Sequence, residues 1–360
     1  MIVYIVLLIL IFLYYFAFMN HKIIYNKRYF LFSSFGSMAV LVGLRGVKTG
    51  EDTRHYLEVF DLVNDASWKT VLTSIKGFQI SIWGESVEYF FAILNKIVSV
   101  FTDCGQIMLL LVSCLTMWLF ARFIYRNIYE HVFIATMVFM CNGLFMASFN
   151  GIREMLAIAI IINSYEYIKT KNYKAVIAIA VMAFFTHMSS IIMIPFFWLF
   201  SKVKNYNKGV RYMALICISL IAAVPILPRI LIVIFPMYLP YFTEHFWDNS
   251  YNGVIIVWIF ELGLVGYMYY TKIKKEGEFF GAIGTIMYVT LAVISIRLWA
   301  FSRVMTYFDP FAMFIFGYGS KRIKITARKY YYAAFMLLML MEYMRYALVP
   351  TRNYVFCWNN

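Results

Sequence analysis

The chain has 360 residues, of which 63% are hydrophobic and only 14% are charged, and its net charge is +14. This composition lies far outside the range of soluble globular domains and excludes them. The sequence has no glycine loop of the GxGxxG or GxxxxGK[ST] type and no nucleic-acid-binding module. It therefore offers no support for an ATP-driven pump or for a protein that binds nucleic acid.

Apolar runs long enough to cross the hydrocarbon core recur along the chain and predict a polytopic, all-α integral membrane protein. The runs are continuously apolar rather than alternating, which argues against membrane-spanning strands. The first run lacks a basic residue before it and a small-residue cleavage site, so we expect a retained helix. The candidate spans are residues 2–20, 29–45, 105–125, 131–149, 152–168, 175–200, 211–228, 253–271, 279–297, 303–319 and 330–349.

Clusters of Lys and Arg between the runs set the orientation, because cytoplasmic loops collect basic residues. The run 175–200 has such a cluster at each end, which predicts a hairpin of two short helices bent near Thr186 and His187. One long helix is the alternative. With the hairpin the chain has 12 spans, and both termini lie outside. The six clusters hold 20 of the 32 basic residues: Lys22/Lys27/Arg28, Arg122/Arg126, Lys169/Lys171/Lys174, Lys202/Lys204/Lys208/Arg211, Lys272/Lys274/Lys275 and Lys321/Arg322/Lys324/Arg328/Lys329.

This topology makes residues 1–360 one integral membrane domain with a long external loop at 46–104 and a smaller one near 229–252. The amphipathic segment 87–101 reads as an interfacial or re-entrant helix. Three prolines make a spanning helix over 228–240 improbable. The long loop carries 8 of the 18 acidic residues, namely Glu51, Asp52, Glu58, Asp61, Asp65, Glu85, Glu88 and Asp103.

The 12 basic residues outside the cytoplasmic clusters are 8 Arg and only 4 Lys, whereas the clusters hold 14 Lys and 6 Arg. Orientation needs only positive charge, but the planar fork of arginine suits phosphate oxygens. The skew predicts an external anionic ligand, such as a lipid-linked phosphate or pyrophosphate. The candidate ligands are Arg45, Arg54, Arg153, Arg297 and Arg303.

Three short motifs resemble those of the EpsG family of bacterial polysaccharide polymerases, a branch of the Wzy-type polymerases. The segment from Arg45 through Gly50, Asp52 and Tyr56 is similar to the family's opening R…GxDxxxY pattern. Residues 150–157, NGIREMLA, are similar to its RQxLA helix start, with Glu154 in place of the usual glutamine. Residues 185–190, FTHMSS, are similar to its HxSA element. The resemblance extends over about residues 1–320.

The resemblance implies a membrane glycosyltransferase with a GT-C-like fold in the bacterial inner (plasma) membrane. Such enzymes join oligosaccharide repeat units carried on undecaprenyl pyrophosphate at the outer, periplasmic face. A chain-length regulator is implied as a further partner. The final polymer can be a capsule, an O-antigen or an exopolysaccharide, and the sequence leaves these open.

The residues fit this chemistry in three roles. Asp52 is the first candidate for the base that takes the acceptor proton, and His187 is the second. Arg153 is expected to stabilise the leaving pyrophosphate, together with the other four arginines. Tyr56, His55 and Glu154 are candidates for binding sugar. No DxD triplet and no metal-ligand spacing occurs, so neither a metal nor another cofactor is expected; inversion at the anomeric carbon is the hypothesis.

Two other classes of protein remain open. A flippase or transporter of lipid-linked oligosaccharides would also need cationic residues, but it often shows internal repeats, and none is evident. An external glycan ligase or acyltransferase would use a similar lipid donor. Acceptor identity distinguishes a ligase from a polymerase.

Overall fold

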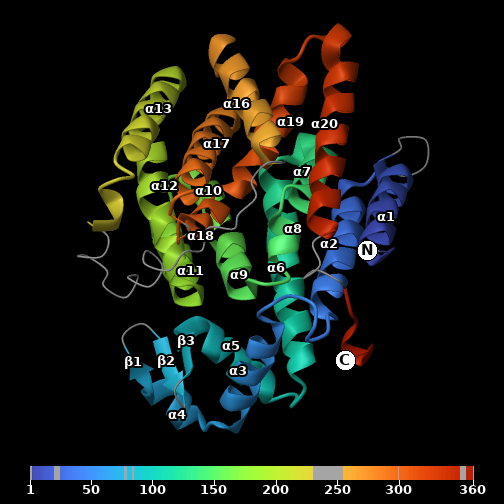
Figure 1. The fold of residues 1–360 in the computed structure, drawn as a ribbon, viewed down its shortest axis with the longest axis vertical. Helices are drawn as coiled ribbons and strands as arrows, with labels where there is room; N and C mark the ends of the chain where they lie inside the picture. Colours follow the sequence, from blue (N-terminus) through green and yellow to red (C-terminus); the bar gives the residue numbers. More distant parts are fainter. Residues whose placement is uncertain are drawn as a thin grey trace. The chain divides into compact units, whose positions relative to one another are not determined.

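The computed structural model describes residues 2–19, 25–76, 79–82, 85–229, 254–298, 300–348 and 354–359. Within residues 75–86 it describes the backbone alone. The chain forms two compact units. The first unit comprises Met1–Thr136, Gly143–Phe197 and Tyr343–Asn360; the second comprises Met137–Asn142 and Trp198–Glu342. Both units are predominantly helical, as the sequence predicts (Figure 1).

The first unit contains the long helices α1 (Ile2–Met19), α2 (Lys27–Gly43) and α6 (Gly105–Asn127). The side chain of Asn26 caps α2 by accepting hydrogen bonds from the backbone N–H groups of its first turn. At the other end of α2, a Cβ on Gly43 would lie 2.7 Å from the Cα of Leu110. Glycine therefore allows α2 and α6 to approach closely just before Arg45.

The segment between α2 and α6 is folded rather than an extended loop. It contains α3 (Thr53–Asp65), α4 (Trp68–Thr73) and α5 (Tyr89–Ser99), with three short strands between α4 and α5. The strands form an antiparallel sheet in the order β1 (Ile75–Lys76), β2 (Gln79–Ile82), β3 (Glu85–Glu88), with Ile80 opposite both Ile75 and Val87. The all-α prediction did not include this sheet, whereas the short amphipathic helix expected over 87–101 corresponds to α5.

Four of the candidate spans are interrupted by polar residues or proline. The breaks fall at Asn142-Gly143, at Asn163-Ser164, at His187 and at Asp309-Pro310. The break at His187 is at the predicted bend. The shorter helices and helical turns of the chain are η1 (Tyr129–His131), α7 (Val132–Cys141), α8 (Leu144–Ala147), α9 (Ile152–Ile162), α10 (Tyr165–Lys169), α11 (Tyr173–Thr186), η2 (Met188–Ile192), α12 (Met193–Lys202), α18 (Ala300–Thr306), η4 (Asp309–Phe311), α19 (Ala312–Arg322) and η6 (Cys357–Asn359).

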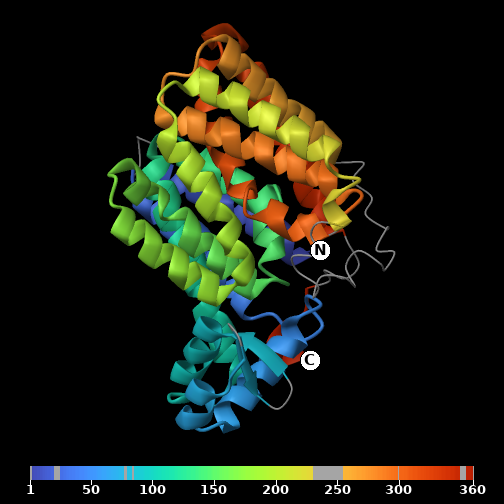
Figure 2. The ribbon, with the colours of Figure 1, turned by 90° about the vertical axis from the view of Figure 1, so that its left-hand side faces the viewer.

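The second unit is built around α13 (Tyr206–Ala222), α16 (Val254–Tyr270) and α17 (Glu276–Ser295), to which most of α20 (Ile325–Ala347) adds. Helices α13 and α17 run side by side (Figures 1 and 2), and the ring of Tyr206 stacks on that of Phe279 at 5.1 Å. The core of this unit also holds polar groups. The side-chain amide of Asn142 donates to Asp309 at 3.0 Å and lies 3.5 Å from a carboxylate oxygen of Glu261.

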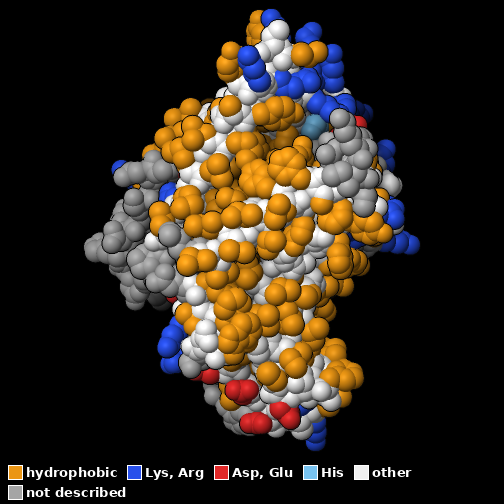
Figure 3. Space-filling model, turned by 90° about the vertical axis from the view of Figure 1, so that its right-hand side faces the viewer, with side chains coloured by type: hydrophobic (Ala, Val, Ile, Leu, Met, Phe, Trp, Pro, Cys, Tyr) orange, Lys and Arg blue, Asp and Glu red, His pale blue; other side chains and the backbone are white. Residues whose placement is uncertain are grey.

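Within the described part of the chain, α1, α6 and α17 are long and apolar enough to cross a membrane, and five further apolar helices are shorter. Helix α1 exposes five large apolar side chains, as expected of a lipid-facing helix: Ile2, Val6, Ile9, Leu13 and Phe16. Figure 3 shows hydrophobic side chains over the middle of one face, with acidic side chains at the lower end where the 46–104 segment lies. Most of the predicted external loop near 229–252 lies outside the described residues.

Candidate active site

The segment that follows α2 docks on the turn that precedes α9. Gly50 has a φ of +83°, and a Cβ at this position would lie 2.5 Å from the carbonyl oxygen of Phe149. The backbone N–H of Glu51 donates to the side chain of Asn150 at 3.2 Å. Only glycine meets both requirements without strain. Two of the three motifs, 45–56 and 150–157, are therefore in direct contact.

Arg45 ties the end of α2 to the start of α3. Its Nε donates to the hydroxyl of Thr53 at 2.8 Å, and its Nη1 donates to the carbonyl oxygen of Val42. The Thr53 hydroxyl in turn donates to the carbonyl of Thr49, and Gln106 donates to the carbonyl of Arg45. The Arg45 side chain is fully buried, and its Nη2 has no hydrogen-bond partner.

The central feature of the site is a carboxylate shared by an arginine and a histidine. Glu88, at the end of β3, accepts from Nη1 of Arg153 at 2.5 Å through one oxygen and pairs with Nδ1 of His187 at 2.9 Å through the other. Arg153 lies in the first turn of α9, and His187 lies at the break between α11 and η2. Three segments far apart in the sequence thus meet at one carboxylate, which is only 4% exposed.

The electrostatics of this triad favour an ionised glutamate. Burial alone would raise the pKa of Glu88, but the hydrogen bond from His187 and the charge of Arg153 outweigh it and lower the pKa below its usual range. Because an ionised carboxylate can only accept, Nδ1 of His187 carries a hydrogen, which leaves Nε2 as the ring nitrogen that can exchange a proton. Glu88 therefore fixes both the tautomer and the orientation of the imidazole.

Aromatic rings hold the arginine from the other side. The guanidinium carbon of Arg153 lies 5.6 Å from the ring centre of Tyr56 and 5.9 Å from that of Phe91, within the range of a cation–π interaction. Tyr56 is buried, and burial raises the pKa of its phenol. Tyr56 therefore stays neutral and packs against Arg153, which joins the first motif to the second.

Several buried polar atoms of this region have no hydrogen-bond partner. They are Nε of Arg153, Nε2 of His187 and the hydroxyl oxygen of Ser190, which follows His187 in the third motif. Buried polar groups in folded proteins are nearly always paired, so each such atom requires an explanation. These three atoms are therefore candidates for contact with a polar ligand.

Four other residues predicted for the site are Asp52, Arg54, His55 and Glu154. Asp52 precedes α3, is exposed, and makes no side-chain hydrogen bond to the helix N-terminus. Arg54 is exposed, and His55 is half-buried with its ring 6.2 Å from that of Tyr56. Glu154 is half-buried in the first turn of α9. The pairing with the glutamate thus favours His187, rather than Asp52, as the better-oriented base.

Arg297 and Arg303 belong to the second unit. Arg297 lies in the turn after α17, Arg303 lies on α18, and both are exposed. Their role in binding pyrophosphate stays a prediction.

The amino-acid sequence alone did not single out Glu88, although this residue connects Arg153 with His187. It was counted only among the eight acidic residues of the external loop. The available signal was its place directly before the amphipathic α5, whose buried face includes Phe91 and Asn95. An acid at the start of a buried helix face requires a partner, and sequence alone does not show which one.

Within the described part of the chain, no group of three or more His, Cys, Asp or Glu side chains comes close enough to hold a metal ion. The five cysteines are unpaired, and two of them, Cys141 and Cys217, are buried.

The triad offers positive charge at Arg153 and a proton acceptor at Nε2 of His187. These are the two groups that a transfer from an anionic leaving group to a hydroxyl requires.

The comparison with known families agrees with the three motifs. A family model described as EpsG family matches residues 28–358, which is nearly the whole chain. No curated protein and no solved structure matches the chain. The match includes every residue of the triad as well as Arg45, Asp52, Arg297 and Arg303. The chain therefore belongs to the EpsG family, whose members are Wzy-like polymerases.

Proposed function

We propose that this protein is a membrane glycosyltransferase that polymerises oligosaccharide repeat units carried on undecaprenyl pyrophosphate. The reaction takes place at the outer face of the inner (plasma) membrane, on a GT-C-like scaffold of about 12 spans. The observation that carries the proposal is the pairing of Glu88 with both Arg153 and His187. This pairing supports the proposal because one buried cluster then holds a cation that would stabilise the leaving group and a base that would accept the acceptor's proton.

In this reaction the acceptor hydroxyl gives its proton to Nε2 of His187 while its oxygen forms a bond to the anomeric carbon of the donor sugar. The bond from that carbon to the pyrophosphate oxygen breaks, and its electron pair leaves with the lipid pyrophosphate. Attack from the side opposite the leaving group inverts the anomeric configuration. Arg153 stabilises the negative charge that develops on the leaving oxygen.

Glu88 supports both halves of the step. It holds the imidazole in the tautomer that accepts a proton, and it stabilises the imidazolium that forms. It also keeps the guanidinium of Arg153 in place until substrate arrives. Arginines supply the charge stabilisation that a metal ion supplies in other transferases, so the reaction is metal-independent. In this proposal the half-buried His55 contacts the sugars, the exposed Arg54 adds positive charge for the pyrophosphate, and Asp52 is the alternative base.

Purified protein in lipid nanodiscs, given a single lipid-linked repeat unit, tests the proposal. We expect products of two or more repeat units by mass spectrometry, with release of the lipid pyrophosphate. Arg153→Ala and His187→Ala should each lower the rate by about 10²–10⁴-fold, the usual size of a lost acid–base or charge-stabilising group. Arg126→Ala, an exposed arginine outside the candidate site, serves as the matched control.

Two other outcomes would replace the proposal. Transfer of the unit only to a different glycan or lipid acceptor would identify a ligase. Movement of the intact lipid-linked unit across a sealed bilayer, with no new glycosidic bond, would identify a transporter. NMR of donor and product linkages tests inversion separately, because retention of the anomeric configuration would require a different mechanism.

A further inference from the structure

A segment near the end of the chain, residues 354–357, pairs with the start of the first motif, and we call it the C-terminal strap. Phe356 forms an antiparallel β-bridge with Arg45. Two backbone hydrogen bonds flank this bridge: from the N–H of Gly46 to the carbonyl of Val355 at 2.7 Å, and from the N–H of Cys357 to the carbonyl of Leu44 at 3.0 Å. The strap and the first motif are thus joined through their backbones although they lie some 300 residues apart in the sequence.

Thr49 fastens the strap with its side chain. Its hydroxyl accepts the N–H of Val355 at 2.7 Å and donates to the carbonyl of the same residue at 3.1 Å. The carbonyl oxygen of Thr49 accepts from the hydroxyl of Thr53, which itself accepts from Nε of Arg45. The Thr49 side chain is buried, so water does not replace these bonds. One threonine therefore links the strap to the first turn of α3.

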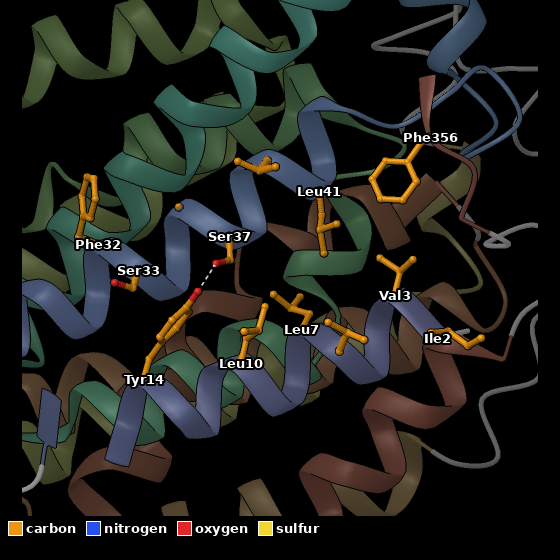
Figure 4. Close-up of a pocket in the computed structure, with 13 residues that line it drawn as sticks. Ile2, Val3, Leu7, Leu10, Tyr14, Phe32, Ser33, Ser37, Leu41 and Phe356 are labelled. Carbon is orange, nitrogen blue, oxygen red and sulfur yellow. Dashed lines mark hydrogen bonds between the residues drawn. The ribbon is translucent and has the colours of Figure 1, made fainter. Parts of the chain in front are cut away.

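Tyr354 touches the elements that carry the first and the second motif. Its hydroxyl donates to the carbonyl of Leu41, near the end of α2, at 2.9 Å. Its ring meets that of Phe149 edge to face, with 6.1 Å between the ring centres. Phe149 is the residue whose carbonyl lies against Gly50 in the docked turn. Figure 4 shows the next aromatic residue of the strap, Phe356, beside Leu41 at the same end of α2.

The segment between α2 and α3 depends on such contacts for its position, because it forms no helix or strand ladder of its own. On one side it docks through Gly50 and Glu51 on the turn before α9. On the other side it is held by the strap. The segment leads directly into α3, where the ring of Tyr56 lies 5.6 Å from the guanidinium carbon of Arg153. A shift of the segment would therefore be passed to Tyr56 and to the arginine of the triad.

We propose that the C-terminal strap positions the first motif for the reaction, with Thr49 and Tyr354 as its positioning residues. Neither residue contacts the triad, and both act through the segment that they hold. This inference rests on the proposed function, which supplies the reaction. It assigns to the end of the chain a part in the candidate site that none of the three motifs contains.

Hydrogen exchange tests the positioning without catalysis. In protein held in lipid nanodiscs, exchange of the backbone amides of residues 46–56 is followed by mass spectrometry. Thr49→Val keeps the shape but removes the hydroxyl, so we expect exchange in this segment to become about tenfold faster, and faster still when residues 354–360 are deleted. Thr49→Ser keeps the hydroxyl and should exchange like the wild type.

Thr136→Val is the matched control. Thr136 is also fully buried, and its hydroxyl donates to a carbonyl within its own stretch of chain, that of Val132. This variant should leave exchange of residues 46–56 unchanged. Tyr354→Phe and Tyr331→Phe form a second pair, because each loses a phenol that donates to a backbone carbonyl, but only Tyr354 belongs to the strap. We expect faster exchange of the segment in the first alone.

Steady-state kinetics with the lipid-linked repeat unit separates positioning from mere stability. We expect kcat of folded Thr49→Val to fall about tenfold and that of the deletion about 10²-fold, with little change in KM, because misplaced groups lower the rate more than they lower binding. Thr49→Ser should restore kcat. A purely structural strap would lower the melting temperature and the yield of folded protein, but not kcat per folded molecule.

The two measurements give separate answers. Unchanged exchange of residues 46–56 in both Thr49→Val and Tyr354→Phe would overturn the inference, and so would faster exchange with wild-type kcat. Equal loss in Thr49→Ser and Thr49→Val would also overturn it, because the hydroxyl would then not matter. If the deletion does not fold, the point variants decide. Faster exchange in the strap variants, with no polymer made by the wild type, would reject the proposed function and leave the strap as the support of this segment.

Discussion

Glu88 divides its two oxygens between two functional side chains, and this arrangement sets what each partner can do. Arg153 receives a fixed counter-charge, and His187 receives a fixed tautomer. A pyrophosphate that approaches Arg153 would compete with Glu88 for the guanidinium, which has further N–H groups to offer, including an Nε without a partner. In the proposed mechanism, this spare donor would bind the pyrophosphate while Glu88 keeps its contact with His187.

Replacement of Glu88 by glutamine tests this arrangement. Glu88→Gln keeps the shape but removes the charge, so the imidazole is no longer fixed in the productive tautomer. We expect turnover to fall by about 10²-fold or more, with a smaller effect on the affinity for the lipid donor. Steady-state kinetics with the purified protein measures both quantities. Glu58→Gln, an exposed acid of α3, is the control, and equal activity of the two variants would contradict the role of Glu88.

The pH dependence of stability follows from the lowered pKa of the same group. A carboxylate whose pKa is lower in the folded state stabilises the fold above its unfolded pKa, and this contribution is lost as pH falls through the folded value. Near neutral pH, the free energy of unfolding of the wild type should exceed that of Glu88→Gln by about 3 kcal/mol, the size expected for a broken buried ion pair. The gap should shrink below the usual pKa of 4.5. Thermal unfolding in detergent across this range measures it; a constant gap at acid pH would argue against the ion pair.

At the scale of elements, the site depends on one docked turn and on helices that stop where a side chain is needed. The turn at Gly50 brings the first motif against the start of α9. The end of α11 at Thr186 releases His187 from helical geometry, with φ −157° and ψ 118°, so that its ring reaches Glu88. Interrupted helices of this kind recur at the binding sites of membrane transport proteins.

Gly50→Ala should undo the docking of the 46–56 segment. A side chain at φ +83° costs about 1–2 kcal/mol, and its Cβ would also meet the carbonyl oxygen of Phe149. We expect a lower melting temperature and reduced activity. Gly263→Ala is the matched control: it lies in a helix with open space around it and should gain about 0.5–1 kcal/mol in stability. Equal melting temperatures for the two variants would show that the docked turn contributes little.

Asn142, which follows α7 and belongs to the second unit, is expected to stabilise two buried acids of that unit. Asn142→Ala removes the amide that donates to Asp309 and faces Glu261. Leaving buried acceptors unpaired costs about 1–3 kcal/mol each, so we expect a clear loss of thermal stability. In an Asp309→Asn background the same change should cost less, because the two residues are coupled. Additive effects in the double-mutant cycle would contradict the interaction.

At the scale of the whole molecule, the sequence predicted where helices form better than where they stop. Every candidate span contains at least one helix, because continuous apolar runs leave few alternatives in a bilayer. The breaks at Asn142, Asn163 and Asp309 were missed, because one or two polar residues barely change the hydropathy of a long run. The bend at His187 was found through the basic clusters on both sides of it, which is a property of the whole chain.

The sequence likewise identified some residues of the candidate site and missed others. Arg153 and His187 lie in short motifs and were named as candidates from the sequence; the structure brings them together, and their roles stay predictions. Glu88 was missed because its partners are 65 and 99 residues away, and no local pattern encodes such a pairing. Asp52 has the residue type of a base, but it is exposed and lacks an orienting partner among the described side chains. Residue type and motif therefore identified candidates, and only tertiary contacts ranked them.

The external position of the 46–104 segment is a prediction of the overall topology. Cys104, at its end, is exposed. In spheroplasts of a Cys357→Ser variant, which removes the other cysteine predicted to lie outside, a membrane-impermeant maleimide should label Cys104, and adding Cys104→Ser should remove the label. A cysteine introduced at the exposed Thr170, in a predicted cytoplasmic cluster, should react only after the membrane is opened. The reverse pattern would place the site on the cytoplasmic face and contradict the orientation.

The most direct test of the account is the surface glycan of cells that lack this gene and carry single variants. Arg153→Ala, Arg153→Lys and Glu88→Gln are expressed at equal membrane levels, with Arg126→Ala as the control, and the glycan is separated on a gel. We predict loss of the polymer ladder in the first three, with single repeat units still reaching the surface glycan or accumulating on lipid, and a ladder in the control. Normal ladders in all variants would contradict the assigned site, and loss of single units from the outer face would contradict the polymerase.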